Sequence, residues 1–277
     1  MRDLSSAECI EAIEETRVLE ARVDGGAFFL RIEHYGHFVC TAIHNGHRMR
    51  PDIASKCAWS EEQRLYEEDP YTADVISRMP ITVVGGDSRF EYDLNRKPEE
   101  CIHEEAWGRK VWKKPLSENQ KKTSRAKHAA FYAVLGTLYG KLAELHPRVV
   151  IYSVHAYNYR RPRMGESPLF NIGTEQLDLR RWQQDIDDWV SALEAIQLPH
   201  VDIRVAINEV FFGRGYHATF TVSRFPNILP LPTEIKKVYM DELTGQPRME
   251  ILEPLHDAFE AAILRHSSAF RERHRMN

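Results

Sequence analysis

The chain has 277 residues, of which 43% are hydrophobic, and this is enough to build one large core. Its formal net charge of −4 gives no global signal for nucleic-acid binding. The N-terminus lacks the apolar segment of a signal peptide, and no stretch has the apolar length of a membrane span, so we expect a soluble cytoplasmic protein that binds no membrane.

The N-terminal part predicts one short helix and three strands. Residues 6–15 are typical of a helix, and residues 18–23 and 27–33 are typical of two strands joined by a glycine-rich turn. The apolar run 38–43 predicts a third strand. We therefore expect a β-meander here and assign residues 1–37 to an N-terminal helix and β-meander extension.

The next segment alternates between loops and short elements. Residues 60–65 predict a short helix, because Ser60 and Gln63 fit a capping box at its start. Residues 81–84 predict a strand that closes on glycines. Residues 97–115 carry charges, prolines and two tryptophans without a clear period, so we expect a long surface loop, and such loops often border functional sites.

Two amphipathic helices are the clearest elements of the second half. Their apolar residues recur at spacings of three and four, as on the buried face of a helix. The two sets are Phe131, Leu135, Leu138, Leu142 and Leu145, and Trp182, Ile186, Trp189, Leu193 and Ile196. Each helix should end at the proline that follows, and the apolar run 149–154 between them predicts a strand.

The C-terminal part completes an α/β pattern. Residues 201–207 predict a strand, a β-rich stretch follows Gly215, and residues 233–240 predict another strand. Residues 254–270 predict a closing helix with its proline in the first turn. Strands, helices between strands and a final helix favour one α/β domain with a central mixed sheet flanked by helices.

Two of the apolar runs end at a histidine: run 38–43 is followed by His44, and run 149–154 is followed by His155. Open α/β sheets bind their ligands at the ends of the strands, so two distant imidazoles can meet there. A single histidine in such a place is more often a hydrogen-bonded structural group. Asn208 also directly follows an apolar run, and the three residues together favour a site.

Two imidazoles and one carboxylate are the common ligand set of a catalytic zinc. Glu67, Glu68 and Asp69 offer three candidate carboxylates after His44. The alternative interpretation is an acidic turn that satisfies backbone donors. None of the four cysteines forms a CxxC pair, which argues against a cysteine-based zinc site.

Several ordered segments resemble the N-formylglutamate amidohydrolase family. They are His44-Asn45-Gly46, Glu68-Asp69-Pro70-Tyr71-Thr72, Ser88-Arg89, Asp93-Leu94-Asn95-Arg96 and His155-Ala156-Tyr157-Asn158, followed by Asn208, Phe212-Gly213-Arg214-Gly215-Tyr216 and Glu234-Ile235-Lys236-Lys237-Val238-Tyr239-Met240. The resemblance covers roughly residues 38–245. It implies a phosphorylase/hydrolase-like fold related to that of zinc carboxypeptidases, and a single domain over residues 1–277.

The resemblance implies a zinc ion held by His44, Asp69 and His155, with Glu68 as the reserve for Asp69. It places Glu234, just before the final strand, as the general base that takes a proton from water. Without the resemblance, a solvated strand residue is the favoured interpretation of Glu234.

The resemblance also implies groups that bind a substrate. Arg96 and Asn95 occupy the positions that receive a substrate carboxylate or the polarised amide oxygen, and Arg89 assists. A local salt bridge from Arg96 to Asp93 or Glu91 is the alternative interpretation.

Asn208 and Arg214 complete the predicted substrate-binding residues. Residues beside the implied ligands differ from the family pattern, notably Ile43, Asn45 and Ala156. Gly213-Arg214-Gly215 stands where the family has a lysine–glycine–glycine run. The positive charge of Arg214 favours an acidic or larger anionic acyl-amino acid.

The sequence thus predicts a zinc-dependent amidohydrolase that acts on a small acyl-amino-acid substrate and binds no nucleic acid. The first alternative is a non-catalytic relative that binds a small anionic ligand or a protein partner. A weaker alternative is RNA binding through residues 157–163, where aromatic residues lie beside arginines.

Overall fold

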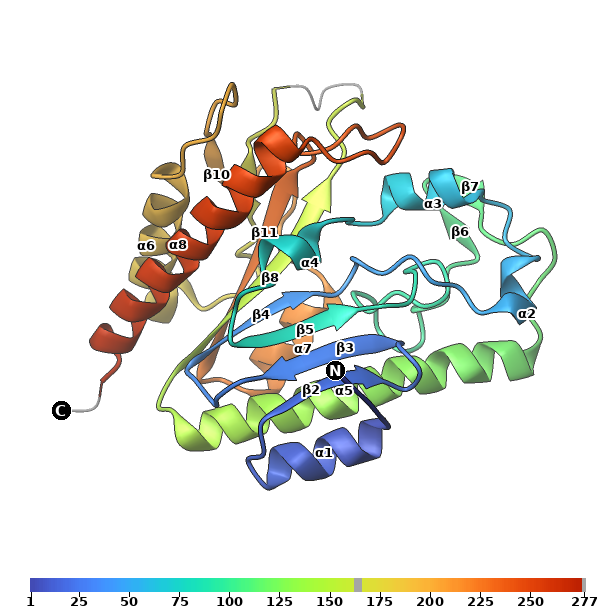
Figure 1. The fold of residues 1–277 in the computed structure, drawn as a ribbon, viewed down its shortest axis with the longest axis horizontal. Helices are drawn as coiled ribbons and strands as arrows, with labels where there is room; N and C mark the ends of the chain where they lie inside the picture. Colours follow the sequence, from blue (N-terminus) through green and yellow to red (C-terminus); the bar gives the residue numbers. More distant parts are fainter. Residues whose placement is uncertain (162–165, 276–277) are drawn as a thin grey trace.

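A nine-stranded mixed sheet forms the centre of the computed structural model, which describes residues 1–161 and 166–275 (Figure 1). The strands lie in the order β1-β2-β3-β5-β4-β8-β11-β9-β10. Their bounds are β1 Arg2–Leu4, β2 Leu19–Val23, β3 Phe28–Ile32, β4 Phe38–Ala42, β5 Ile81–Gly85, β8 Val149–Tyr157, β9 Phe170–Ile172, β10 Val205–Ile207 and β11 Ile228–Lys236. The expected α/β domain with a mixed sheet is confirmed.

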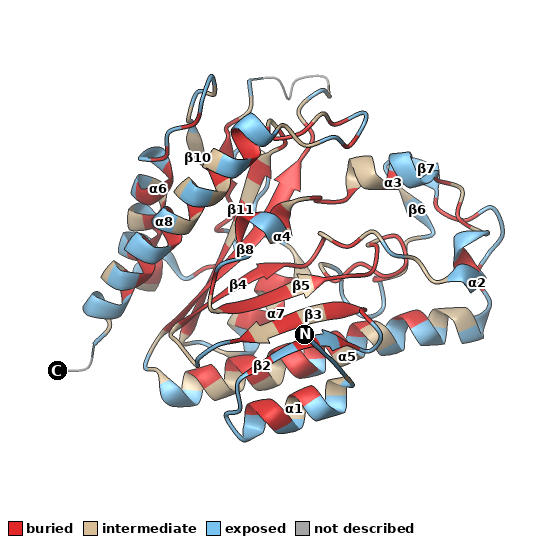
Figure 2. Cartoon of the chain, viewed as in Figure 1, coloured by how far each residue is buried: buried red, intermediate tan, exposed pale blue. Residues whose placement is uncertain are grey.

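The four central strands β5, β4, β8 and β11 run parallel to one another. β4 and β8 are buried along their whole length, which explains why they appear in the sequence as continuous apolar runs (Figure 2). Because these strands are parallel, their carboxyl ends lie at one edge of the sheet, and residues far apart in the sequence meet there.

The predicted β-meander is not formed. β2 and β3 pair antiparallel as expected, but β5 lies between β3 and β4, antiparallel to β3 and parallel to β4. β1 adds a parallel strand beside β2. The N-terminal strands therefore extend the central sheet, and the apolar patterns of the strands do not reveal which of them become neighbours.

Helices cover both faces of the sheet (Figure 1). One face carries α1 (Ser6–Glu14), α5 (Glu118–Leu145) and α7 (Tyr216–Arg224) over a core built around Leu135, Leu138 and Ile151. The other face carries α4 (Thr72–Val75), α6 (Leu179–Glu194) and α8 (Met249–Arg273). Among the described helices, none is both long and apolar enough to cross a membrane.

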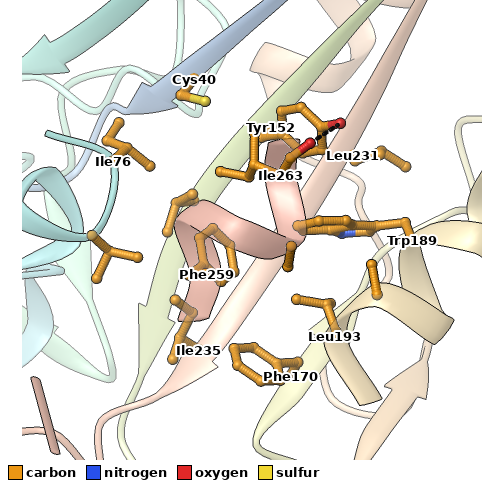
Figure 3. Packing of buried hydrophobic residues seen from close by; sticks show 14 of the residues in the cluster. Cys40, Ile76, Tyr152, Phe170, Trp189, Leu193, Leu231, Ile235, Phe259 and Ile263 are labelled. Atoms are coloured by element: carbon orange, nitrogen blue, oxygen red, sulfur yellow. Dashed lines mark hydrogen bonds between the residues drawn. The ribbon is translucent and has the colours of Figure 1, made fainter. Parts of the chain in front are cut away.

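The core under α6 and α8 consists of large side chains from the helices and the sheet (Figure 3). Tyr152 of β8 and Trp189 of α6 are fully buried, with ring centroids 4.9 Å apart. Their polar atoms are satisfied, because the Tyr152 hydroxyl donates to the Ile263 carbonyl at 3.5 Å and Trp189 Nε1 donates to Thr233 Oγ1 at 3.0 Å. The predicted apolar stripes face the core, except that Leu145 at the end of α5 is exposed.

The segment between β5 and α5 is more ordered than a surface loop. It contains a small hairpin of β6 (Glu105–Ala106) and β7 (Arg109–Lys110), and buried Val111 and Trp112 pack in a third apolar cluster. α2 (Pro51–Ala54) and α3 (Glu61–Glu67) lie nearby, at the right of Figure 1. The capping box predicted for α3 is present.

Four predictions in the C-terminal part are corrected. The strand predicted over 233–240 is β11, which begins earlier, at Ile228, and ends at Lys236. The β-rich stretch expected after Gly215 is helix α7, whose β-branched and aromatic residues favour strands in isolation. The strand predicted over 201–207 is only the three-residue β10. α8 begins at Met249, so Pro254 lies inside the helix rather than in its first turn.

Candidate metal centre and active site

The register of the central strands assembles the site. Glu234 of β11 lies directly beside His155 of β8, and Ser153 lies beside Thr41 of β4. Side chains alternate along a strand, so Ser153 and His155 share the face of β8 whose earlier residues Val149 and Ile151 enter the core under α5. One face of β8 therefore changes from apolar to polar toward its carboxyl end.

His44 and His155 come together with Asp69, as the sequence predicts. His44 Nδ1 lies 3.4 Å and His155 Nδ1 3.2 Å from Asp69 Oδ2, and the two rings are 5.0 Å apart. All three residues are at least 96% buried, and their ligand atoms lie within 4.8 Å of one another. His155 lies inside β8, which continues to Tyr157, rather than just beyond the strand. This group could hold a metal ion.

The second nitrogen of each imidazole has a partner that fixes the ring. His44 Nε2 donates to Asp93 Oδ1 at 2.7 Å, and His155 Nε2 lies 3.4 Å from Ser153 Oγ. Ser153 is in turn 3.0 Å from Nδ1 of His217 on α7. Such contacts orient histidine ligands, and here they turn both Nδ1 atoms toward Asp69.

Asp69 and Asp93 are buried anions. Burial alone would raise the pKa of Asp69, but hydrogen bonds from His155 and His44 hold that pKa well below its usual range. Burial also opposes ionisation of Asp93, whereas the charges of Arg89 and His44 lower its pKa. These two carboxylates raise the pKa of His44 despite its burial. A cation is therefore favoured at this point of the structure.

Glu68, the reserve for Asp69, faces away from the two histidines. Its carboxylate accepts hydrogen bonds from Ser88 Oγ and His47 Nδ1 and lies 3.8 Å from Arg64. Adjacent residues in this turn point in different directions, which the sequence does not reveal. The structure thus supports Asp69 and not Glu68 as the acidic member of the group.

Glu234 is neither a solvated strand residue nor located before the final strand, because it lies within β11 and lines the same cavity as His44 and His155. Burial raises the pKa of its carboxyl to about 7, although the charge of His155 opposes the shift. A carboxyl with a pKa near neutrality is suited to accept and return a proton.

The cavity above these residues has a volume of about 570 Å³ and is lined by several cations. Arg89 is paired with Asp93 at 2.7 Å, and Arg214 at the rim is paired with Glu175 at 2.5 Å. Arg96 is exposed, and neither the predicted salt bridge nor any other ion pair of its guanidinium occurs among the described residues.

Lys237 is a cation of this cavity that the sequence analysis does not single out. Its Nζ donates to the carbonyls of Tyr66 and Glu68 at 2.8 and 2.6 Å, and no carboxylate of the described chain forms an ion pair with it. Burial lowers its pKa to about 8. Only its place next to the Glu234 segment marks it in the sequence.

Asn95 lines the cavity and also shapes it. Its Oδ1 accepts from the backbone N–H of His217 at 3.2 Å and so holds the first turn of α7, which leaves its amide Nδ2 to donate to a ligand. A side chain at Gly215 would collide with Asn95, since a Cβ there would lie 2.2 Å from Oδ1. Asn95 thus links the Asp93-to-Arg96 segment to α7.

Asn208 is not brought to the cavity. Its Oδ1 accepts from the Thr174 backbone N–H and its Nδ2 donates to Thr174 Oγ1, both at 2.8 Å. Its φ of +54° lies in the left-handed region that asparagine tolerates. The structure therefore gives Asn208 a role in a turn after β10.

The segment considered for RNA binding is engaged elsewhere. Tyr157 is buried and donates to the Pro168 carbonyl, and Arg161 pairs with Glu67. Residues 162 and 163 lie outside the described residues.

Comparison with known proteins gives consistent results. The family model of N-formylglutamate amidohydrolase matches residues 36–240. The fold is similar to that of N-formylglutamate amidohydrolase from Ralstonia eutropha JMP134, with a TM-score of 0.69 and 16% identity over 89% of this chain and 98% of that chain. It is also similar to a gene product from Agrobacterium tumefaciens, with a TM-score of 0.65 and 15% identity over 86% of this chain and 95% of that chain. No curated protein sequence matches this chain.

Proposed function

Because this chain belongs to the N-formylglutamate amidohydrolase family, we propose that it is a zinc-dependent enzyme that hydrolyses the amide bond of an N-formyl or other N-acyl amino acid. The observation that carries this proposal is the buried group of His44, Asp69 and His155 with Glu234 beside it in one cavity. Two imidazoles and one carboxylate fit the ligand set of a catalytic zinc.

When bound, zinc polarises an amide carbonyl and lowers the pKa of water to about 7. The chain itself supplies the proton transfers. Glu234 takes a proton from the attacking water as its oxygen bonds to the acyl carbon. Glu234 then returns the proton to the nitrogen as the C–N bond breaks, which leaves a free amine and a carboxylic acid that loses its own proton to solvent at neutral pH. Its raised pKa suits both steps.

The cations of the cavity favour a substrate with a carboxylate. Arg96 and Lys237 line the cavity without forming an ion pair in the described part of the chain. We assign Arg96, with the amide of Asn95, to the carboxylate of the amino acid, since a guanidinium binds a carboxylate through two parallel hydrogen bonds. Arg214, although paired with Glu175, adds a donor at the rim.

Arg89 acts mainly by holding other groups. Its guanidinium binds Asp93, which in turn orients His44. The charge of Arg89 also contributes to the positive potential felt by Asp69 and Glu234. We therefore propose that Arg89 stabilises negative charge that develops on the acyl oxygen.

The direct test is release of a free amine from a panel of N-formyl and N-acyl amino acids by zinc-loaded protein. We expect turnover of at least one acidic member, and none of a matched amide that lacks the carboxylate. A ligand that raises the melting temperature but is never consumed would instead support the non-catalytic alternative.

A further inference from the structure

A second, more open cavity of about 660 Å³ adjoins the metal cavity. The two cavities share Glu67, Trp107 and Arg161 as lining residues, so they lie side by side. The metal cavity alone is already larger than a formyl group requires. A substrate that reaches from the metal cavity into the neighbouring one can therefore carry a much larger acyl group.

Trp107 stands where the two cavities meet, in an unusual backbone position. It lies with Gly108 in the two-residue turn between β6 and β7, and the φ values of the two residues are +49° and +72°. This turn pattern favours Asn-Gly, and a bulky aromatic side chain is uncommon in the left-handed region. Trp107 is also 42% exposed. Such an outlier at the mouth of a site points to a role in binding.

The second cavity offers flat surfaces of two kinds. Trp59 lies 5.8 Å from Trp107 between ring centroids, and Tyr66 forms another part of the wall. The guanidinium of Arg109 lies 4.2 Å from the Trp59 ring, and that of Arg161 lies 5.6 Å from the Tyr66 ring. Indole rings and guanidinium planes both stack on a planar π-system.

The charge in this cavity is also suited to an aromatic ring. Arg161 is neutralised by Glu67, whereas Arg109 has only Gln63 as a polar partner, at 3.4 Å, and no ion pair within the described residues. One side of the Arg109 guanidinium packs on the Trp59 ring, so its opposite side is the one available for a cation–π contact with a ligand.

We propose that the second cavity is a subsite for an aryl-bearing acyl group, so that the substrates are N-arylacyl amino acids. This inference rests on the proposed function, since the metal cavity must hold the amide bond. The aryl ring lies against Trp107 and the guanidinium of Arg109, while the amino-acid carboxylate occupies the opposite end of the metal cavity.

The competing explanation is that Trp107 merely covers the apolar cluster of Trp59 and Phe90, because its ring is also 5.7 Å from Phe90. Trp107→Asn separates the two explanations. Asparagine suits the turn, so the hairpin should persist while the indole is removed. Leu179→Asn on α6 is the matched control, because Leu179 is similarly exposed, at 45%, and lines neither cavity.

The experiment measures binding of a graded series to zinc-loaded Glu234→Gln protein by titration calorimetry and tryptophan fluorescence. The series is N-acetyl-, N-benzoyl-, N-phenylacetyl- and N-(3-phenylpropionyl)-L-glutamate, which moves the ring outward step by step. We expect at least one aryl member to bind about tenfold more tightly than the acetyl compound. Trp107→Asn should abolish this gain, and Leu179→Asn should preserve it.

Wild-type turnover of the same series separates the two proposals. If the acetyl or formyl compound is hydrolysed and no aryl compound gains affinity, the subsite proposal fails and the proposed function stands. If the aryl compound still binds more tightly than the acetyl compound in both Trp107→Asn and Arg109→Gln, the subsite proposal is also overturned. If no member is bound or hydrolysed, the proposed function fails and the subsite falls with it.

Discussion

Nε2 of His44 lies 2.7 Å from Oδ1 of Asp93, and this contact fixes the orientation of the first histidine. The other oxygen of Asp93 accepts from Arg89 and His103, at 2.7 and 3.0 Å. One fully buried carboxylate therefore connects the proposed metal ligand His44 to the cations of the cavity. It directs Nδ1 of His44 toward Asp69.

Asp93→Asn should weaken zinc binding by about 10- to 100-fold, because the neutral amide orients and polarises His44 less well. The measurement is a zinc dissociation constant from competition with a chromophoric chelator. Asp87→Asn is the matched control, since Asp87 is another buried carboxylate of this segment but bonds Tyr92 and Lys127. Equal zinc affinities in the two variants would show that Asp93 does not support zinc binding through His44.

Glu234→Gln should lower kcat by about 10²- to 10⁴-fold while zinc content stays at the wild-type level, because the amide cannot take up the proton of the attacking water. Parallel measurements of steady-state rate and metal stoichiometry check this. Turnover that survives intact would show that another group is the base, and loss of zinc would show that Glu234 acts through the metal.

The pH profile of kcat/KM should have an acidic limb set by Glu234. Only the ionised carboxylate accepts a proton, so activity should fall as the pH drops below the pKa, which burial raises to about 7. The charge of a bound metal ion lowers this pKa, so the limb of the loaded enzyme should lie at or below pH 7. The same limb in the residual activity of Glu234→Gln would assign it to a different group.

His217 should make the stability of the metal-free protein depend on pH. Burial lowers its folded-state pKa to about 3 from the ordinary 6.5, so the unfolded chain binds more protons between these values. The contribution of the neutral His217 to the free energy of unfolding is therefore fully present above pH 6.5. It falls by about 1.4 kcal/mol per pH unit as the pH drops from 6.5 toward 3.

Urea unfolding of wild-type protein and of His217→Gln at several pH values measures this slope. The variant should show a smaller slope between pH 6.5 and 4. Tyr139→Phe is the control, because it removes the hydroxyl that lies 2.8 Å from His217 but keeps the imidazole. A slope that is the same in all three proteins would rule out His217 as its source.

Much of the fold could be predicted from local pattern. The runs that become β4 and β8 and the stripes of α5 and α6 are long and regular, so burial on one face leaves a clear signal. The order of strands could not be predicted, because insertion of β5 between β3 and β4 depends on long-range pairing.

Helix α7 could not be predicted from the sequence for a related reason. Its residues favour strands in isolation, and its first turn is held by Asn95, more than a hundred residues earlier in the chain. Tertiary contacts therefore override the local propensity.

The candidate site was predictable where a residue ends or nearly ends a buried strand. His44 and His155 stand out for this reason, and the structure places both against Asp69. Asp93 did not stand out as the partner of His44, because 49 residues separate them and only the fold brings them together. Asn208 shows the opposite case, since a strand-end position alone does not place a residue in the cavity.

The most direct test of the proposed metal centre is the zinc content of the protein purified at near-neutral pH without a chelator, measured by elemental analysis. We expect about one zinc ion per chain in wild-type protein and also in Glu68→Gln, because the Glu68 carboxylate faces His47 and Ser88. We expect His155→Ala to lose zinc. Wild-type protein without zinc, or His155→Ala with full zinc, would contradict the proposed metal centre.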